Sequence, residues 1–150
     1  MEGIKEVMVK EHAKIAILLE KLEADIANNQ EARKDFQELR SYMKQHFYIE
    51  DDAIFSIFSN MNDKEVSSIF DLMQEHGLIL GDLNDVEKAI TKNLPVDLIK
   101  LKKDMKEHFE IEEKFFYPTL EKELNENQKS FIVMKVHEIS KRQSEKPAHK

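Results

Sequence analysis

The segments His46-Phe-Tyr-Ile-Glu50 and His108-Phe-Glu-Ile-Glu112 share the pattern His-Phe-x-Ile-Glu. They end two longer segments, residues 39–50 and 101–112, which agree at Leu, Met, Lys, His, Phe, Ile and Glu when one is shifted by 62 positions. On an α-helix, two side chains four residues apart lie on one face, about one turn apart. Each segment therefore offers one imidazole and one carboxylate to the same point in space, and two such segments facing each other would form a metal site.

A second pair of matched segments surrounds His12 and His76. Residues 8–26 overlay residues 72–90 when shifted by 64 positions, and Glu-His occurs at the same place in both. In each segment the apolar residues recur at steps of three and four, which is typical of one buried helix face. We expect helices over residues 4–27, 31–58, 64–91 and 96–117, separated by turns at 28–30, 59–63 and 93–95. This tandem repeat of a helical hairpin predicts an all-α, up-down-up-down antiparallel four-helix bundle.

Two further features complete the expected fold. Pro118 lacks a backbone N–H, so it should end or kink the fourth helix at Tyr117. Beyond residues 125–127 we expect a short fifth, C-terminal helix that packs across the bundle or onto its end, with these apolar positions: Phe131, Ile132, Met134, Val136 and Ile139. We expect the bundle domain to span residues 1–143 and a flexible basic tail to span residues 144–150. Asn62 and Glu65 have the spacing of a capping box at the start of the third helix.

Composition narrows the classes of function. The 150 residues are 41% hydrophobic and 35% charged, which fits one soluble domain. The chain has no cysteine, so thiolate zinc, iron–sulfur and disulfide sites are excluded. A net charge of −7 argues against nucleic-acid binding. We also expect no membrane association and a cytoplasmic location, because no apolar run approaches transmembrane length and the first residues have no apolar signal core.

Six polar residues interrupt the four apolar faces. A single histidine on such a face is more often a hydrogen-bonded core residue than a ligand, but here the residues recur in matched positions on all four helices. Burying two carboxylates is costly without a compensating positive charge, and no lysine or arginine lies on these faces to supply one. Six donors are too many for one tetrahedral zinc and suit two metals bridged by the glutamates. The predicted metal ligands are His12, His46, Glu50, His76, His108 and Glu112.

With these residues, the chain resembles the hemerythrin-like HHE cation-binding family over about residues 4–120. The resemblance implies an oxo- or hydroxo-bridged, non-haem di-iron centre, with the four histidines as terminal ligands and Glu50 and Glu112 as bridges. Two iron ions are the implied cofactor, with manganese or zinc as substitutes. Oxygen-carrying hemerythrins have a fifth histidine in His-x-x-x-His on the third helix, whereas Leu72 and Leu80 flank His76 here. In this respect the chain is similar to iron-centre repair proteins and HHE-domain sensors.

Three classes of function remain open from the sequence. The first is a di-iron protein that binds or reacts with O2 or NO for sensing, scavenging or stress response. The second is a di-iron oxidase or peroxidase, or an iron donor that repairs damaged iron centres. The third is an iron buffer or sensor that signals to a protein partner. Open metal positions would be filled by water, a diatomic ligand or one of four nearby carboxylates: Glu11, Asp51, Glu75 and Glu113. Phe47 and Phe109 are interpreted as core packing, and His137 as a non-ligand.

Overall fold

The computed structural model describes residues 2–57 and 61–145, and every regular element in these ranges is a helix. In chain order the elements are α1 (Ile4–Ala27), α2 (Arg33–Ile57), α3 (Asp63–Thr91), α4 (Ile99–Ile111), the π-helical turn η2 (Glu112–Phe116), α5 (Tyr117–Glu123) and α6 (Glu126–Glu145). The predicted all-α fold is confirmed.

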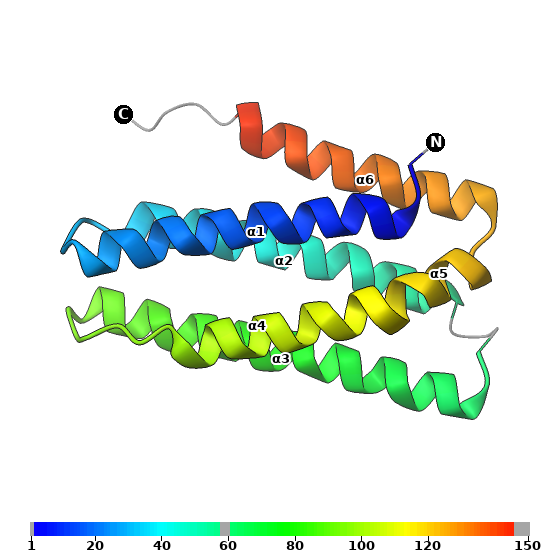
Figure 1. Cartoon of the computed structure of the whole chain (residues 1–150), viewed down its shortest axis with the longest axis horizontal. Helices are drawn as coiled ribbons and strands as arrows, with labels where there is room; N and C mark the ends of the chain where they lie inside the picture. The colour runs from blue at the N-terminus through cyan, green and yellow to red at the C-terminus, as the bar shows by residue number, and fades with distance from the viewer. Residues whose placement is uncertain (1, 58–60, 146–150) are drawn as a thin grey trace.

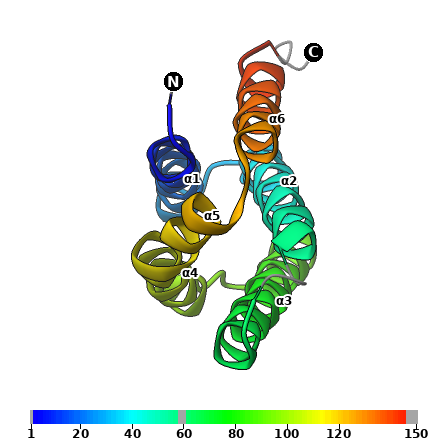
Figure 2. The ribbon, with the colours of Figure 1, turned by 90° about the vertical axis from the view of Figure 1, so that its right-hand side faces the viewer.

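The long helices alternate in direction (Figure 1). α1 and α2 form one antiparallel hairpin, and α3 pairs with α4 in the second. η2 and α5 continue in line with α4, so the three together make the fourth helix of the bundle. The end view shows α1, α2, α3 and α4 surrounding a common interior (Figure 2). That interior is filled by buried aliphatic and aromatic side chains from all four helices.

The turns within the two hairpins repeat, as the sequence does. Asn29 and Asn93, which are 64 positions apart, both adopt a left-handed backbone with φ of 54°. Asparagine tolerates this conformation better than most residues and commonly follows a helix end. At the start of α3, the Asn62 side chain accepts a hydrogen bond from the Glu65 backbone N–H, and the Asn62 backbone N–H donates one to the Glu65 side chain. The predicted capping box is therefore confirmed.

Two helices start two or three residues later than predicted, and α3 starts one residue earlier, at Asp63. The second helix begins at Arg33 instead of residue 31. The fourth begins at Ile99 instead of residue 96, because the Asp97 carboxylate accepts the Ile99 backbone N–H at 2.8 Å and closes a turn ahead of the helix. Residues 58–60, where the second helix was expected to end, lie outside the described residues.

The fourth helix does not end at Pro118, because it widens in the turn before it. The Tyr117 N–H donates to the carbonyl of Glu112, five residues back, which defines a π turn. Pro118 then occupies the first turn of α5, where a missing N–H costs little. The Thr119 hydroxyl donates to the carbonyl of Phe115 at 2.8 Å. The proline thus produces a local change of helix type, and α5 packs against α1 and α2.

The fifth helix of the prediction is α6, and it is long. Its 20 residues lie along α1 and α2, not across the bundle or on its end (Figures 1 and 2). Val133 is buried on the inner face, whereas Phe131 and Met134 are exposed, contrary to the predicted apolar positions. α6 reaches Glu145, within the expected tail, and residues 146–150 lie outside the described residues. Within the described ranges, no helix combines the length and apolar character needed to cross a membrane.

Candidate metal centre

The six predicted ligands converge in the interior of the bundle. α1 supplies His12, α2 supplies His46 and Glu50, α3 supplies His76, α4 supplies His108, and η2 begins with Glu112. All six are buried, with at most 5% of each residue exposed. Their donor atoms form two groups in which every atom lies within 4.8 Å of the others. Group 1 is His12, His46, Glu50 and Glu112, and group 2 is Glu50, His76, His108 and Glu112.

Glu50 belongs to both groups because its two oxygens face different histidines. Its Oε2 lies 3.2 Å from His46 Nε2, in group 1. Its Oε1 lies 3.2 Å from His76 Nε2, in group 2. A carboxylate with one oxygen toward each imidazole pair has the arrangement of a bridging ligand.

Glu112 divides its oxygens in the same way. Its Oε1 lies 3.2 Å from His12 Nε2, whereas its Oε2 lies 3.0 Å from His108 Nε2 and 3.4 Å from His76 Nε2. The four histidines therefore form two pairs, His12 with His46 and His76 with His108, and both carboxylates lie between the pairs. This arrangement fits two cations better than one.

Two buried atoms that could bind a metal support a site for two cations. Glu50 Oε1 and His108 Nε2 make no hydrogen bond to any described residue, although each lies near a polar atom of the cluster. An unpaired buried polar atom costs about 1–3 kcal/mol. Atoms that approach one another without hydrogen-bond geometry point toward a common third position, as ligands do around a cation. Both atoms belong to group 2.

The charges of the cluster are strongly coupled. Burial alone would lower the pKa of His76, but the neighbouring carboxylates of Asp51, Glu112 and Glu50 raise it to about 11. Burial also opposes ionisation of Glu112, yet the neighbouring imidazoles of His108 and His12 hold the pKa of this carboxyl well below its usual value. A protonated His76 thus balances the ionised carboxylate of Glu112 in the core. A bound cation would replace this proton, so its binding competes with protonation.

Three additional carboxylates lie beside the Nδ1 atoms of three of the histidines, whose Nε2 atoms face the cluster. Glu113 Oε2 lies 2.8 Å from His12 Nδ1, Asp51 Oδ1 lies 2.8 Å from His76 Nδ1, and Glu75 Oε1 lies 2.7 Å from His108 Nδ1. Carboxylates in this position fix the orientation of an imidazole and increase its basicity.

The four carboxylates proposed from the sequence as fillers of open metal positions therefore have other partners. Glu75, Asp51 and Glu113 lie on the outer side of the histidines, away from the cluster. Glu11, the fourth, accepts the hydroxyl of Tyr42 at 2.5 Å and pairs with Lys14 at 3.2 Å. These contacts correct the expectation that such carboxylates enter the centre.

Phe47 and Phe109 pack directly on the histidines of the other hairpin. The ring of Phe47 stacks on His76 with centroids 4.1 Å apart, and that of Phe109 stacks on His12 at 3.8 Å. Phe47 is only 2% exposed, but Phe109 is half-buried. Phe109 also lines a groove of about 650 Å3 between α1 and α4, as do Glu113 and Met105. The outer side of His12 is therefore one aromatic ring away from a surface groove.

Tyr117, which the sequence did not indicate, places its hydroxyl beside all four members of group 1. The residue is completely buried, and its hydroxyl oxygen lies 2.5 Å from Glu50 Oε2, 2.8 Å from His12 Nε2, 3.1 Å from Glu112 Oε1 and 3.5 Å from His46 Nε2. Burial and the negative charges of the two glutamates raise the pKa of Tyr117 well above its usual value. The only available signal in the sequence was a tyrosine directly before a proline that disturbs a ligand-bearing helix.

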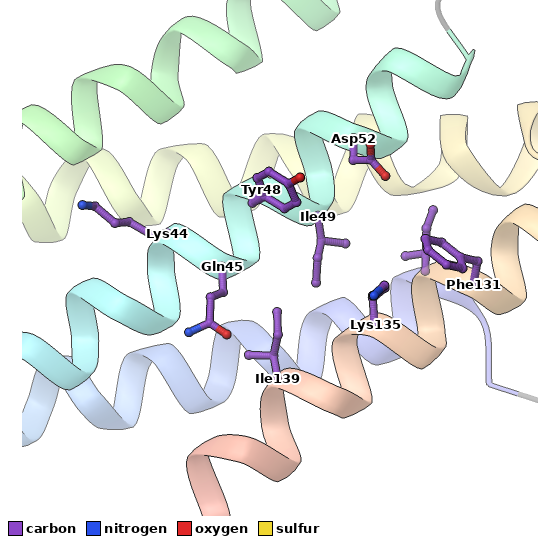
Figure 3. Close-up of a pocket in the computed structure, with 9 residues that line it drawn as sticks. Lys44, Gln45, Tyr48, Ile49, Asp52, Phe131, Lys135 and Ile139 are labelled. Atoms are coloured by element: carbon purple, nitrogen blue, oxygen red, sulfur yellow. The ribbon is translucent and has the colours of Figure 1, made fainter. Parts of the chain in front are cut away.

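Other features of the surface lie apart from the cluster. His137, on α6, contacts Glu2 at 3.0 Å and is exposed. A groove of about 550 Å3 lies on the surface between α2 and α6, and Tyr48 and Phe131 are among the residues that line it (Figure 3). Its lining includes none of the six predicted ligands.

Comparison with known proteins agrees with this arrangement. The family model described as the hemerythrin HHE cation binding domain matches residues 4–100. The match ends within α4, ahead of His108 and Glu112, so the last two donors come from the structure and the internal repeat. No curated protein and no solved structure gives a significant match. A match over well more than half of the chain, together with two buried His/Glu groups that share their carboxylates, shows that this protein belongs to the hemerythrin HHE cation-binding domain family.

Proposed function

We propose that this protein holds two iron ions with His12, His46, Glu50, His76, His108 and Glu112, and that it binds or reacts with O2 or NO. The proposal rests mainly on one observation: in both Glu50 and Glu112, one carboxylate oxygen faces one pair of histidines and the other oxygen faces the other pair. Imidazole nitrogens and carboxylate oxygens suit iron, and paired carboxylates in a helical bundle are a common way to hold two iron or manganese ions.

The donor count supports a small external ligand. Each group provides two imidazoles and one oxygen from each of two carboxylates, which is four donors. Iron commonly takes about six ligands in nitrogen and oxygen sites, so positions remain for a small molecule. When bound, the iron pair supplies the electrons for reaction with O2 or NO.

The protein surroundings select for small, uncharged ligands. Phe47 and Phe109 cover the histidines with apolar surface, and the carboxylates Asp51, Glu75 and Glu113 fix the ring orientations. The groove beside Phe109 and Glu113 provides an approach toward His12. A buried site that is covered by apolar side chains admits a diatomic molecule more easily than a charged metabolite.

Metal content tests the first part of this proposal. Protein prepared with sufficient iron should contain close to two iron atoms per chain, because two sets of four donors are present. Elemental analysis of the purified protein measures this directly. A content near one, or a preference for zinc over iron under the same conditions, would contradict the di-iron assignment.

Reaction with gases tests the second part. We expect the reduced, iron-loaded protein to oxidise within seconds to minutes in air and to give a distinct spectrum with NO. Stopped-flow absorption follows both reactions. Many rounds of reversible oxygen uptake would indicate a carrier. No response to either gas, with ready transfer of iron to a chelator, would favour an iron donor or buffer instead.

A further inference from the structure

The hydroxyl of Tyr117 has more polar neighbours than it can satisfy by hydrogen bonding. It lies within 3.1 Å of a carboxylate oxygen of both Glu50 and Glu112. A hydroxyl has one proton, so Tyr117 can donate fully to only one of these two oxygens at a time. Both oxygens nevertheless lie at hydrogen-bond distance from it.

The four polar contacts of the Tyr117 hydroxyl, to His12, His46, Glu50 and Glu112, have the geometry of a ligand position. In octahedral coordination with bonds of about 2.1 Å, each ligand atom has four neighbours at about 3 Å. The Tyr117 oxygen has four such neighbours at 2.5–3.5 Å, and they are one atom from each member of group 1. It approaches the oxygen of Glu50 that faces His46 and the oxygen of Glu112 that faces His12.

We propose that the phenolic oxygen of Tyr117 is a direct ligand of the cation held by group 1. This inference rests on the proposed di-iron function. As the bond between oxygen and metal forms, the phenol proton passes to bulk water. Group 1 then has five protein donors and group 2 has four, so the two halves of the centre differ despite the repeat in the sequence.

The repeat in the sequence does not give the other half an equivalent ligand. A shift of 62 positions, which overlays His46 on His108 and Glu50 on Glu112, aligns Phe55 with Tyr117, and phenylalanine has no oxygen to coordinate a metal. α2 also continues as a regular α-helix to Ile57, without the π turn that places Tyr117 over Glu112. Glu50 Oε1 and His108 Nε2, the two ligand atoms without a hydrogen bond to any described residue, both lie in group 2.

An anionic fifth donor has a consequence for reactivity. A phenolate stabilises the more highly charged oxidation state of iron, because its negative charge lies within bonding distance. The group 1 iron should therefore be the more easily oxidised of the two. Group 2 keeps the larger number of positions for an external ligand.

The three tyrosines of the chain allow a controlled test of this proposal. Phenolate bound to ferric iron gives an intense visible charge-transfer band and enhanced ring vibrations in resonance Raman spectra. We expect both signals in the oxidised, iron-loaded protein and their loss in Tyr117→Phe, whose iron content is measured alongside the spectra. Tyr42→Phe is the matched control, because Tyr42 is also buried and donates to a carboxylate, Glu11, outside the two groups.

A second variant keeps the test independent of how Tyr117→Phe folds. Tyr42→Phe combined with Tyr48→Phe leaves Tyr117 as the only tyrosine, and both spectral signals should remain. Two bound iron atoms without a phenolate signal, or a signal that survives in Tyr117→Phe, would overturn the ligand assignment while leaving the di-iron proposal intact. Failure of the unaltered protein to bind iron would overturn both.

Discussion

Glu112→Ala is expected to reduce the iron content from close to two atoms per chain to less than one. The substitution removes one oxygen donor from each group at once, because Glu112 faces His12 with one oxygen and His108 with the other. It also removes a negative charge from between two cations, which in two-metal sites lie about 3.5–4 Å apart. Both cations therefore lose a ligand and gain mutual repulsion. Elemental analysis and calorimetric titration with ferrous iron measure the effect.

Glu110→Ala is the matched control for this substitution. Glu110 lies on the same helix, is exposed and belongs to neither group, so this variant should retain two iron atoms. Circular dichroism of both variants separates loss of metal from loss of fold. If Glu112→Ala kept two tightly bound iron atoms, Glu112 could not be a bridge between them.

His108→Ala is expected to empty group 2 and leave about one iron atom per chain. His108 provides one of only two imidazoles in that group, and its Nε2 is one of the two ligand atoms without a hydrogen bond to any described residue. Loss of a residue that merely orients a ligand typically weakens metal binding by about 10–100-fold, so loss of a ligand itself should cost more than about 100-fold. The measurement is the affinity of the weaker site, obtained by titration.

The control for His108→Ala is His137→Ala. His137 lies on α6 and contacts Glu2 at the surface, so its removal should leave the iron content unchanged. Equal loss of iron in both variants would mean that α6 contributes to the site. Loss of both iron atoms in His108→Ala alone would show that the two cations bind only as a pair.

The sequence by itself determined the class of fold and the residues that gather in its core. Helical spacing is local: a histidine and a glutamate four residues apart lie on one face whatever surrounds them. The repeated segments placed such a pair in the middle of the second and fourth helices, and a single histidine in the first and third. Antiparallel helices joined by the turns at Asn29 and Asn93 then bring these midpoints to one level.

The tertiary structure determined which atoms of these residues face one another. Which oxygen of Glu50 faces which histidine depends on side-chain rotations in the packed core. The same is true of the pairing of His12 with Glu113, which joins two different helices. Sequence spacing carries no information about contacts between helices, so the outer carboxylates were mistaken for fillers of the metal positions.

The position of the Tyr117 side chain could not be predicted from the sequence at all. In a regular α-helix, a residue five positions beyond Glu112 points about 140° away from it, out of the ligand face. The π turn adds one residue to that turn, so Tyr117 comes back over Glu112 and its hydroxyl reaches group 1. The buried face shifts with it, since Phe116 is buried whereas Phe115 is only half-buried. Pro118 indicated that the helix would be disturbed there, but not that it would widen, continue as α5 and pack against α1 and α2.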